Sequence, residues 1–152
     1  MAIFRQLEIS PFELQSQCAD RSLRMRPFSK EITKMDGVPA DLALSGFTNA
    51  VLIQICLGEY QVQFHFHPVG SISVEAKWEL RDTSGTVVDG MDRKVRRDAI
   101  YAHRLLGKRI TGASLDAPRS FSLRFESGDV LTIYDDSREY ESFSIQPGDI
   151  FV

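Results

Sequence analysis

The stretch from residue 61 to residue 80, QVQFHFHPVGSISVEAKWEL, decides the fold. Apolar and polar residues alternate without a break on both sides of a Pro68-Val69-Gly70 turn. This alternation is typical of antiparallel strands with one buried face. It predicts a hairpin centred near Val69 that places Phe64 opposite Val74 and continues in register on either side.

Further strands are predicted outward from this hairpin, because similar apolar runs end at Gly, Pro or Asp. In the later part of the chain, Leu131 and Ile133 are expected to face Phe125 and Leu123. Segments 50–80 and 113–146 share one order of strand, loop and meander, which indicates an internal duplication. The additional strands are predicted at residues 51–57, 110–115, 121–126, 130–134, 140–145 and 150–152.

Residues 91–106 change to a helical period. Val95, Ala99, Ala102 and Leu106 form one apolar stripe, and Gly107 stands where a left-handed C-cap is expected. The sequence therefore predicts an α+β fold: mainly an antiparallel β sandwich or half-open barrel of eight or nine strands, with one main helix near residues 92–106.

Length and composition indicate one globular domain. The chain has 152 residues, of which 43% are hydrophobic and 26% charged, and this composition excludes disordered and disulfide-scaffold classes. Residues 1–46 are expected to be an irregular N-terminal part and residues 47–152 a β-rich core.

Charge and cysteine content narrow the function classes. The net charge of −3 argues against a general nucleic-acid binder. No apolar run is long enough for a membrane helix, and residues 1–6 lack a basic and apolar leader pattern. Cys18 and Cys56 lie far apart, and Cys56 is expected to be a small hydrophobe on an interior strand. A cytoplasmic protein in a reducing compartment is predicted.

His65 and His67 project from one face of a predicted strand, at a spacing that suits two metal ligands. The predicted hairpin places Ser73 opposite His65 and Glu75 on the diagonal, so a His65/His67/Glu75 metal site is one candidate. The alternative is a solvated strand face, because Gln and Lys side chains share it, and on this interpretation the protein needs no cofactor.

The HxH pattern resembles the cupin fold, which would imply a metal-dependent or ligand-binding β-barrel. A cupin has a Glu three or four residues after the second His, whereas Glu75 stands eight positions after His67. No His follows the Pro147-Gly148 turn, where a cupin has its last ligand.

Two oppositely charged segments are candidate partner-binding surfaces. Residues 93–109 hold seven basic residues against one Asp, and residues 116–152 hold eight acidic residues against three Arg. On the predicted helix, one basic face with an apolar anchor opposes the buried stripe, as a docking site would. That face consists of Arg93, Arg97, Ile100, Arg104 and Lys108. The alternative is a solvated helix face.

The acidic end combines carboxylates with aromatic side chains. Asp135, Asp136 and Tyr140 are candidates for a protein-binding rim that would repel nucleic acid. The alternative is a polar hairpin loop at residues 135–138.

The C-terminal segments LLGKRI (105–110), FSLRFESGDVLTI (121–133) and YESF (140–143) resemble a group of small, mostly uncharacterised bacterial β-rich domains. Some similar domains act as immunity proteins beside polymorphic toxins. The resemblance covers about a third of the chain and brings no catalytic residue with it.

Together these observations predict a non-enzymatic protein-binding domain with one protein partner, in its sharpest form an immunity-like protein. The alternative class is the metal or ligand binder built on His65 and His67. Pairing of residues 150–152 with a second copy, which would form a homodimer, stays open.

Overall fold

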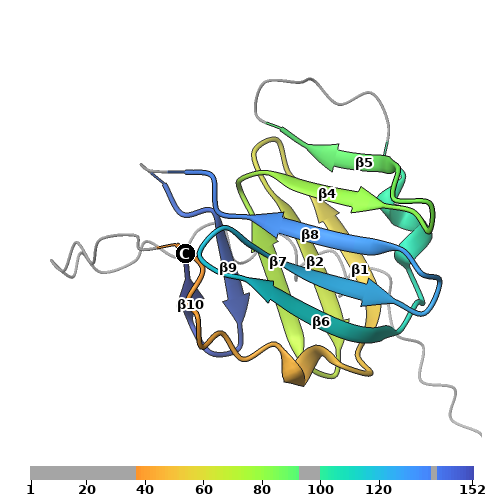
Figure 1. The fold of residues 1–152 in the computed structure, drawn as a ribbon, viewed down its shortest axis with the longest axis horizontal. Coiled ribbons are helices and arrows are strands. Elements are labelled where there is room, and N and C mark those ends of the chain that lie inside the picture. Colours follow the sequence, from red (N-terminus) through yellow and green to blue (C-terminus); the bar gives the residue numbers. More distant parts are fainter. Residues whose placement is uncertain (1–36, 93–99, 138–139) are drawn as a thin grey trace, which may run out of the picture. The chain divides into compact units, whose positions relative to one another are not determined.

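A computed structural model of the chain describes residues 37–92, 100–137 and 140–152. All of them belong to one of the two compact units into which the chain divides, Lys34–Val152. They form ten strands and two 3-10 turns, η1 (Ser45–Phe47) and η2 (Ala102–Leu105). The strands make two five-stranded antiparallel sheets that lie one behind the other (Figure 1).

Each sheet is assembled from two separate stretches of the chain. Sheet A contains, in spatial order, β1 (Val51–Leu57), β2 (Val62–His67), β3 (Gly70–Val74), β9 (Phe143–Gln146) and β10 (Ile150–Phe151). Sheet B contains, in spatial order, β5 (Val87–Met91), β4 (Trp78–Arg81), β8 (Val130–Tyr134), β7 (Ser120–Phe125) and β6 (Ile110–Asp116). The sandwich part of the prediction is confirmed.

The core lies between the sheets and consists of the inward residues of the alternating strands. Phe64 of sheet A packs edge-on against Trp78 of sheet B, with ring centroids 5.5 Å apart. Phe121 of sheet B meets Phe143 of sheet A in the same manner at 5.0 Å. Aromatic pairs in this geometry stabilise a core beyond the area they bury.

The predicted strand 71–80 is divided between the two sheets. It ends as β3 at Val74 and begins again as β4 at Trp78, and the chain crosses the sandwich between them. The backbone N–H groups of Glu75 and Ala76 donate to the Ser142 carbonyl at this crossing, at 3.0 and 3.1 Å. A single continuous strand is therefore wrong here.

The topology repeats within the chain. The meander β1–β2–β3 joins sheet A and is followed by the hairpin β4–β5 in sheet B; the meander β6–β7–β8 joins sheet B and is followed by β9–β10 in sheet A. The two repeats thus exchange their hairpins. We call β1–β5 with the residues before β1 repeat 1, and β6–β10 with the residues before β6 repeat 2.

Local details of the two repeats match position by position. Leu52 faces Phe66 and Ile110 faces Phe125, and a bulge follows Leu52 and Ile110 alike. The 3-10 turns η1 and η2 precede β1 and β6. Each is followed by a residue in the left-handed region, Asn49 at φ 70° and Gly107 at φ 76°.

The predicted helix near residues 92–106 is wrong where the structure describes it. Met91 still belongs to β5, and only Ala102–Leu105 are helical, as one 3-10 turn. Ala102 and Leu105 are fully buried, whereas Leu106, expected in the stripe, is 43% exposed. The buried pair is spaced three residues apart, which fits the 3-10 period. Val95 and Ala99 lie outside the described residues.

The first hairpin has a tighter register than predicted. Phe64 faces Ile72 instead of Val74, so the turn is Pro68-Val69. Gly70 follows at φ 130°, and a Cβ there would overlap the Gln146 carbonyl of β9. The shift is of two residues, and because strand faces alternate with period two, every side chain keeps its predicted face.

Predictions for the second half of the chain also need correction, one in strand register and one in the start of a strand. Leu131 faces Leu123 and Ile133 faces Phe121, again two residues from the expected partners. The predicted strand 140–145 begins only at Phe143. Ten strands replace the eight or nine expected.

Candidate functional site

The predicted metal ligands are not brought together. His65 faces Ser71, not Ser73, and its Nε2 lies 3.7 Å from the Cys56 Sγ. His67 is exposed opposite Val51, and Glu75 lies past the end of β3 at the crossing between sheets. Within the described ranges, no group of three His, Cys, Asp or Glu side chains could hold a metal ion.

Cys56 differs from its prediction as a small interior hydrophobe. It is disulfide-bonded, and it is only partly buried on β1. It faces Gln63 across the strand pair, so it belongs to the outer, polar face of sheet A. The other cysteine of the sequence, Cys18, lies outside the described residues.

Part of the predicted basic surface is described. The Arg104 guanidinium lies 3.3 Å from the buried Asp129 carboxylate of the β7–β8 turn, so this side chain is tied to the fold. Ile100 is half-buried and packs against the core. Lys108 is exposed, and its carbonyl accepts from the Leu52 N–H at 3.1 Å. Arg93 and Arg97 lie outside the described residues.

The predicted acidic rim also makes contacts within the fold. Asp135 accepts from the Ser142 hydroxyl at 2.6 Å, and Asp136 accepts from the Lys77 N–H at 3.3 Å. Both carboxylates therefore help to fasten the second crossing between the sheets, from β8 to β9. Tyr140 is 61% exposed.

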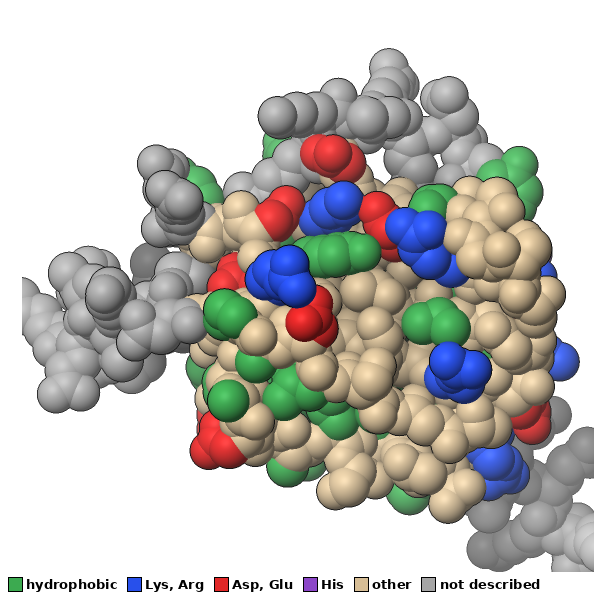
Figure 2. Space-filling view, in the orientation of Figure 1, with side chains coloured by type: hydrophobic (Ala, Val, Ile, Leu, Met, Phe, Trp, Pro, Cys, Tyr) green, Lys and Arg blue, Asp and Glu red, His purple; other side chains and the backbone are tan. Residues whose placement is uncertain are grey.

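An ordered polar cluster lies on sheet B, on β4 and the end of β8. Glu79 binds Lys77 at 3.1 Å and Arg81 at 2.9 Å and accepts from the Tyr134 hydroxyl at 3.1 Å. The Lys77 ammonium lies 4.9 Å from the centre of the Tyr134 ring. Figure 2 shows this face, with charged side chains gathered over β4 and β8 and mostly uncharged surface over β6 and β7.

These contacts change the proton affinities of the cluster. Partial burial raises the pKa of Glu79, but the hydrogen bonds from Lys77 and Arg81 outweigh it and hold that pKa below its usual value. Burial and the neighbouring Glu79 charge raise the pKa of Tyr134. The hydrogen bond to Glu79 raises the pKa of Lys77. At neutral pH these shifts favour the charged forms of Glu79 and Lys77 and the neutral form of Tyr134.

Exposed apolar side chains along β1 were missed by the sequence analysis. Ile53 is 59% exposed, Leu57 55%, and Tyr60 in the following loop 76%. The run VLIQICL predicts a buried interior strand, but β1 is an edge strand of sheet A. The sequence held no signal for this exposure, because edge strands usually carry Lys or Pro and this run carries neither.

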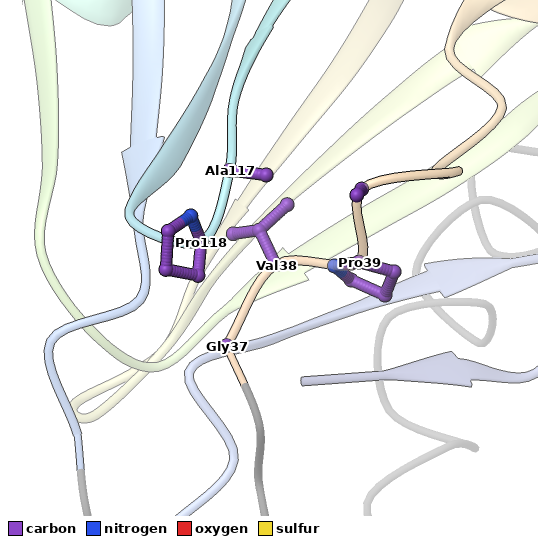
Figure 3. Close-up of a pocket in the computed structure, with 6 residues that line it drawn as sticks. Gly37, Val38, Pro39, Ala117 and Pro118 are labelled. Atoms are coloured by element: carbon purple, nitrogen blue, oxygen red, sulfur yellow. The ribbon is translucent and has the colours of Figure 1, made fainter.

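A shallow apolar pocket of about 440 Å³ lies where the segment before η1 meets the β6–β7 turn (Figure 3). Val38 points toward Ala117 and Pro118 there, and its N–H donates to the Pro118 carbonyl at 2.9 Å. The pocket offers no charged side chain. It is lined by Gly37, Val38, Pro39, Ala40, Ala117 and Pro118.

Comparisons with protein-family models, with curated proteins and with solved structures give no match for this chain. In the part of the chain that the structure describes, no helix has the length and apolar character to cross a bilayer. The class defined by the geometry is a two-sheet antiparallel β fold with an internal repeat.

Proposed function

We propose that this protein is a non-enzymatic binding domain for one protein partner, and that the partner contacts the edge of sheet A at β1. The observation that carries the proposal is the exposure of Ile53, Leu57 and Tyr60 along this strand and its loop. Exposed apolar side chains grouped on one edge mark interaction sites. Tyrosine in particular is enriched where proteins meet.

A fourth exposed side chain extends the same surface. The Gly107 N–H donates to the Leu52 carbonyl at 2.8 Å, which brings the neighbouring residues Leu106 and Ile53 to adjacent backbone positions. Leu106 is 43% exposed. The surface therefore spans β1 and the end of η2, two stretches held together by backbone hydrogen bonds, and such a rigid platform binds with little ordering cost.

The sharper form of the proposal is an immunity-like protein that neutralises a toxin by covering it. Its support is the resemblance of segments 105–110, 121–133 and 140–143 to bacterial β domains of that kind. The exposed Lys108 next to Leu106 adds a charge that could speed association with an acidic partner surface.

Affinity capture from the native host tests the proposal. The tagged wild-type protein is expected to retain one stoichiometric partner, and the Ile53→Asp variant is expected to lose it. Phe151→Asp is the matched control, because Phe151 is also an exposed apolar residue on an edge strand of sheet A, on β10 at the opposite edge. Absence of any retained protein contradicts the binding function, and equal retention by Ile53→Asp contradicts the β1 surface.

A further inference from the structure

The internal repeat shows how one edge strand of this fold is covered. The segment before β1 runs antiparallel along β6: the Val38 N–H donates to the Pro118 carbonyl at the far end, at 2.9 Å. At the near end, the Asn49 N–H donates to the Ile110 carbonyl at 2.8 Å. Val38 is 2% exposed and lies beside Ala117 and Pro118, and Leu115 of β6 is partly buried against the core.

The equivalent end of β1 carries exposed side chains in the part of the chain that the structure describes. Leu57 faces Val62 at the end of its hairpin as Leu115 faces Phe121, so Leu57 and Leu115 occupy equivalent positions. Leu57 is nevertheless 55% exposed. The loop after it places Tyr60 at the position of Pro118, and Tyr60 is 76% exposed. At the end of β1, Leu57 and the Tyr60 carbonyl thus occupy the positions that Leu115 and the Pro118 carbonyl occupy at the end of β6, where Val38 binds.

The two repeats differ in sequence at the position of Val38. Matching residues before β6 to those before β1 sets Ala102 at the position of Leu44 and Leu105 at that of Phe47, and all four are buried. The same match sets Arg96 at the position of Val38. A guanidinium cannot replace a valine against an aliphatic surface without losing its hydration. In sequence, repeat 2 therefore has a charged residue where repeat 1 has a valine; Arg96 itself lies outside the described residues.

We propose that the end of β1 formed by Ile55, Leu57 and the loop 58–61 docks an extended segment of the protein partner, with a branched aliphatic side chain in the place that Val38 takes on β6. This inference rests on the proposed binding function and names the chemistry of the segment. The segment's backbone N–H would donate to the carbonyl of Tyr60, as Val38 donates to Pro118. Extended peptides are commonly recognised in this way, by main-chain hydrogen bonds together with one side-chain pocket.

The segment that covers β6 supplies the probe. The peptide GVPADLALSGF (residues 37–47), with blocked termini, is titrated into the ¹⁵N-labelled full-length protein and followed by NMR. Saturable shift changes are expected at residues 55–62, with a dissociation constant in the millimolar range, because a short flexible peptide loses much entropy on binding. The peptide GDPADLALSGF, which carries Asp in place of Val38, is expected to cause none.

Three protein variants test where the peptide binds. Leu57→Asp is expected to weaken binding of the first peptide by about tenfold or more, the value of one buried leucine contact. Val87→Asp, at an exposed apolar position of sheet B, is expected to bind it unchanged. Leu57→Ser gives the same comparison with less risk to folding, and the dispersion of each variant's spectrum verifies the fold.

The inference is overturned if no saturable change occurs, if the changes map to β6 instead of β1, or if the Leu57 variants bind the peptide as well as the wild type does. None of these results decides whether a folded partner is captured through the surface at Ile53, which the affinity-capture experiment tests separately. A partner captured by the wild type while the peptide fails would keep the binding function and remove only the docked segment.

Discussion

Val51 and Arg109 face each other in an isolated antiparallel bridge, and they occupy equivalent positions in the two repeats. The hydrogen bonds around this bridge match as well: Leu52 N–H donates to the Lys108 carbonyl at 3.1 Å, and Ile110 N–H donates to the Ala50 carbonyl at 2.8 Å. A pseudo-two-fold axis therefore passes through the bridge, and the two sheets are joined there by the same atoms from each repeat.

Asn49 and Gly107 lie beside this bridge with positive φ, and substitutions there measure what this backbone conformation costs in stability. Gly107→Ala is expected to lower the free energy of unfolding by about 1 kcal/mol, because φ 76° disfavours a Cβ although the space around it is open. Asn49→Gly, at the equivalent position, is expected to change it by less than about 0.5 kcal/mol, since asparagine already tolerates this region. Chemical denaturation measures both.

Gly46→Ala is the matched control for Gly107→Ala, because Gly46 also has open space around it but does not have a positive φ. A cost at Gly46 as large as that at Gly107 would contradict the backbone explanation.

The packing of η2 distinguishes a 3-10 turn from the α-helix that the sequence indicated. Leu105→Ala is expected to cost about 2–5 kcal/mol of stability, as for other fully buried leucines. Leu106→Ala is expected to cost less than about 0.5 kcal/mol, because this side chain is exposed. A helical stripe through Leu106 would give the opposite order in the two denaturation midpoints.

Glu79 makes stability depend on pH in one direction. The pKa of Glu79 is lower in the folded protein than in the unfolded chain. Its contribution to the free energy of unfolding is therefore complete above the unfolded-state pKa and is lost as the pH falls through the folded-state pKa. Glu79→Gln is expected to reduce stability at pH 7 by about 1 kcal/mol or less, as for partly exposed ion pairs. The wild type and the variant are expected to converge once the pH has fallen below the lowered pKa of Glu79, because this carboxyl is then protonated in both the folded and the unfolded protein.

Tyr134→Phe serves as the partial variant in the same series, since it removes only the hydroxyl bond to Glu79 and keeps both ion pairs. It should retain most of the pH dependence. A difference between wild type and Glu79→Gln that persists unchanged at low pH would show that the loss comes from packing and not from charge.

The sequence was most informative where strand faces decide burial. Every inward residue of the hairpin at 62–74 was placed correctly, because an error of two residues in register keeps the faces. The crossing at residues 75–77 left no trace in the pattern. Val74, Ala76 and Trp78 are all fully buried, because the chain passes from one sheet to the other with its apolar side kept toward the same core.

The candidate site was harder to predict than the fold. β1 has the composition of a buried central strand, and only its position at the edge of sheet A, which depends on long-range pairing, exposes Ile53 and Leu57. Arg104 was expected to face a partner, but it is bound to Asp129, a residue 25 positions later in the sequence. Contacts of this kind follow from topology and not from local periodicity.

The exchange of hairpins between repeats predicts how the chain behaves when it is cut. Neither repeat can complete a sheet alone, because β3 needs β9 and β8 needs β4 as neighbours. A fragment of residues 1–94 and a fragment of residues 95–152 are each expected to lack cooperative unfolding and to show poor NMR dispersion. Mixed together, they are expected to form a one-to-one complex that restores the dispersed spectrum, since the exchanged hairpins bury the apolar core at their junction.

Substitution at the shared core provides the control for this complementation. Phe143→Ala in the second fragment removes the ring that packs on Phe121 and completes β9 beside β3, so the complex should weaken by about 3 kcal/mol or more, over a hundredfold in dissociation constant. Phe151→Ala, on the exposed edge strand β10, should weaken it far less. If either fragment folded alone and unfolded cooperatively, the exchanged arrangement would be contradicted, because that repeat would then contain a complete hydrophobic core by itself.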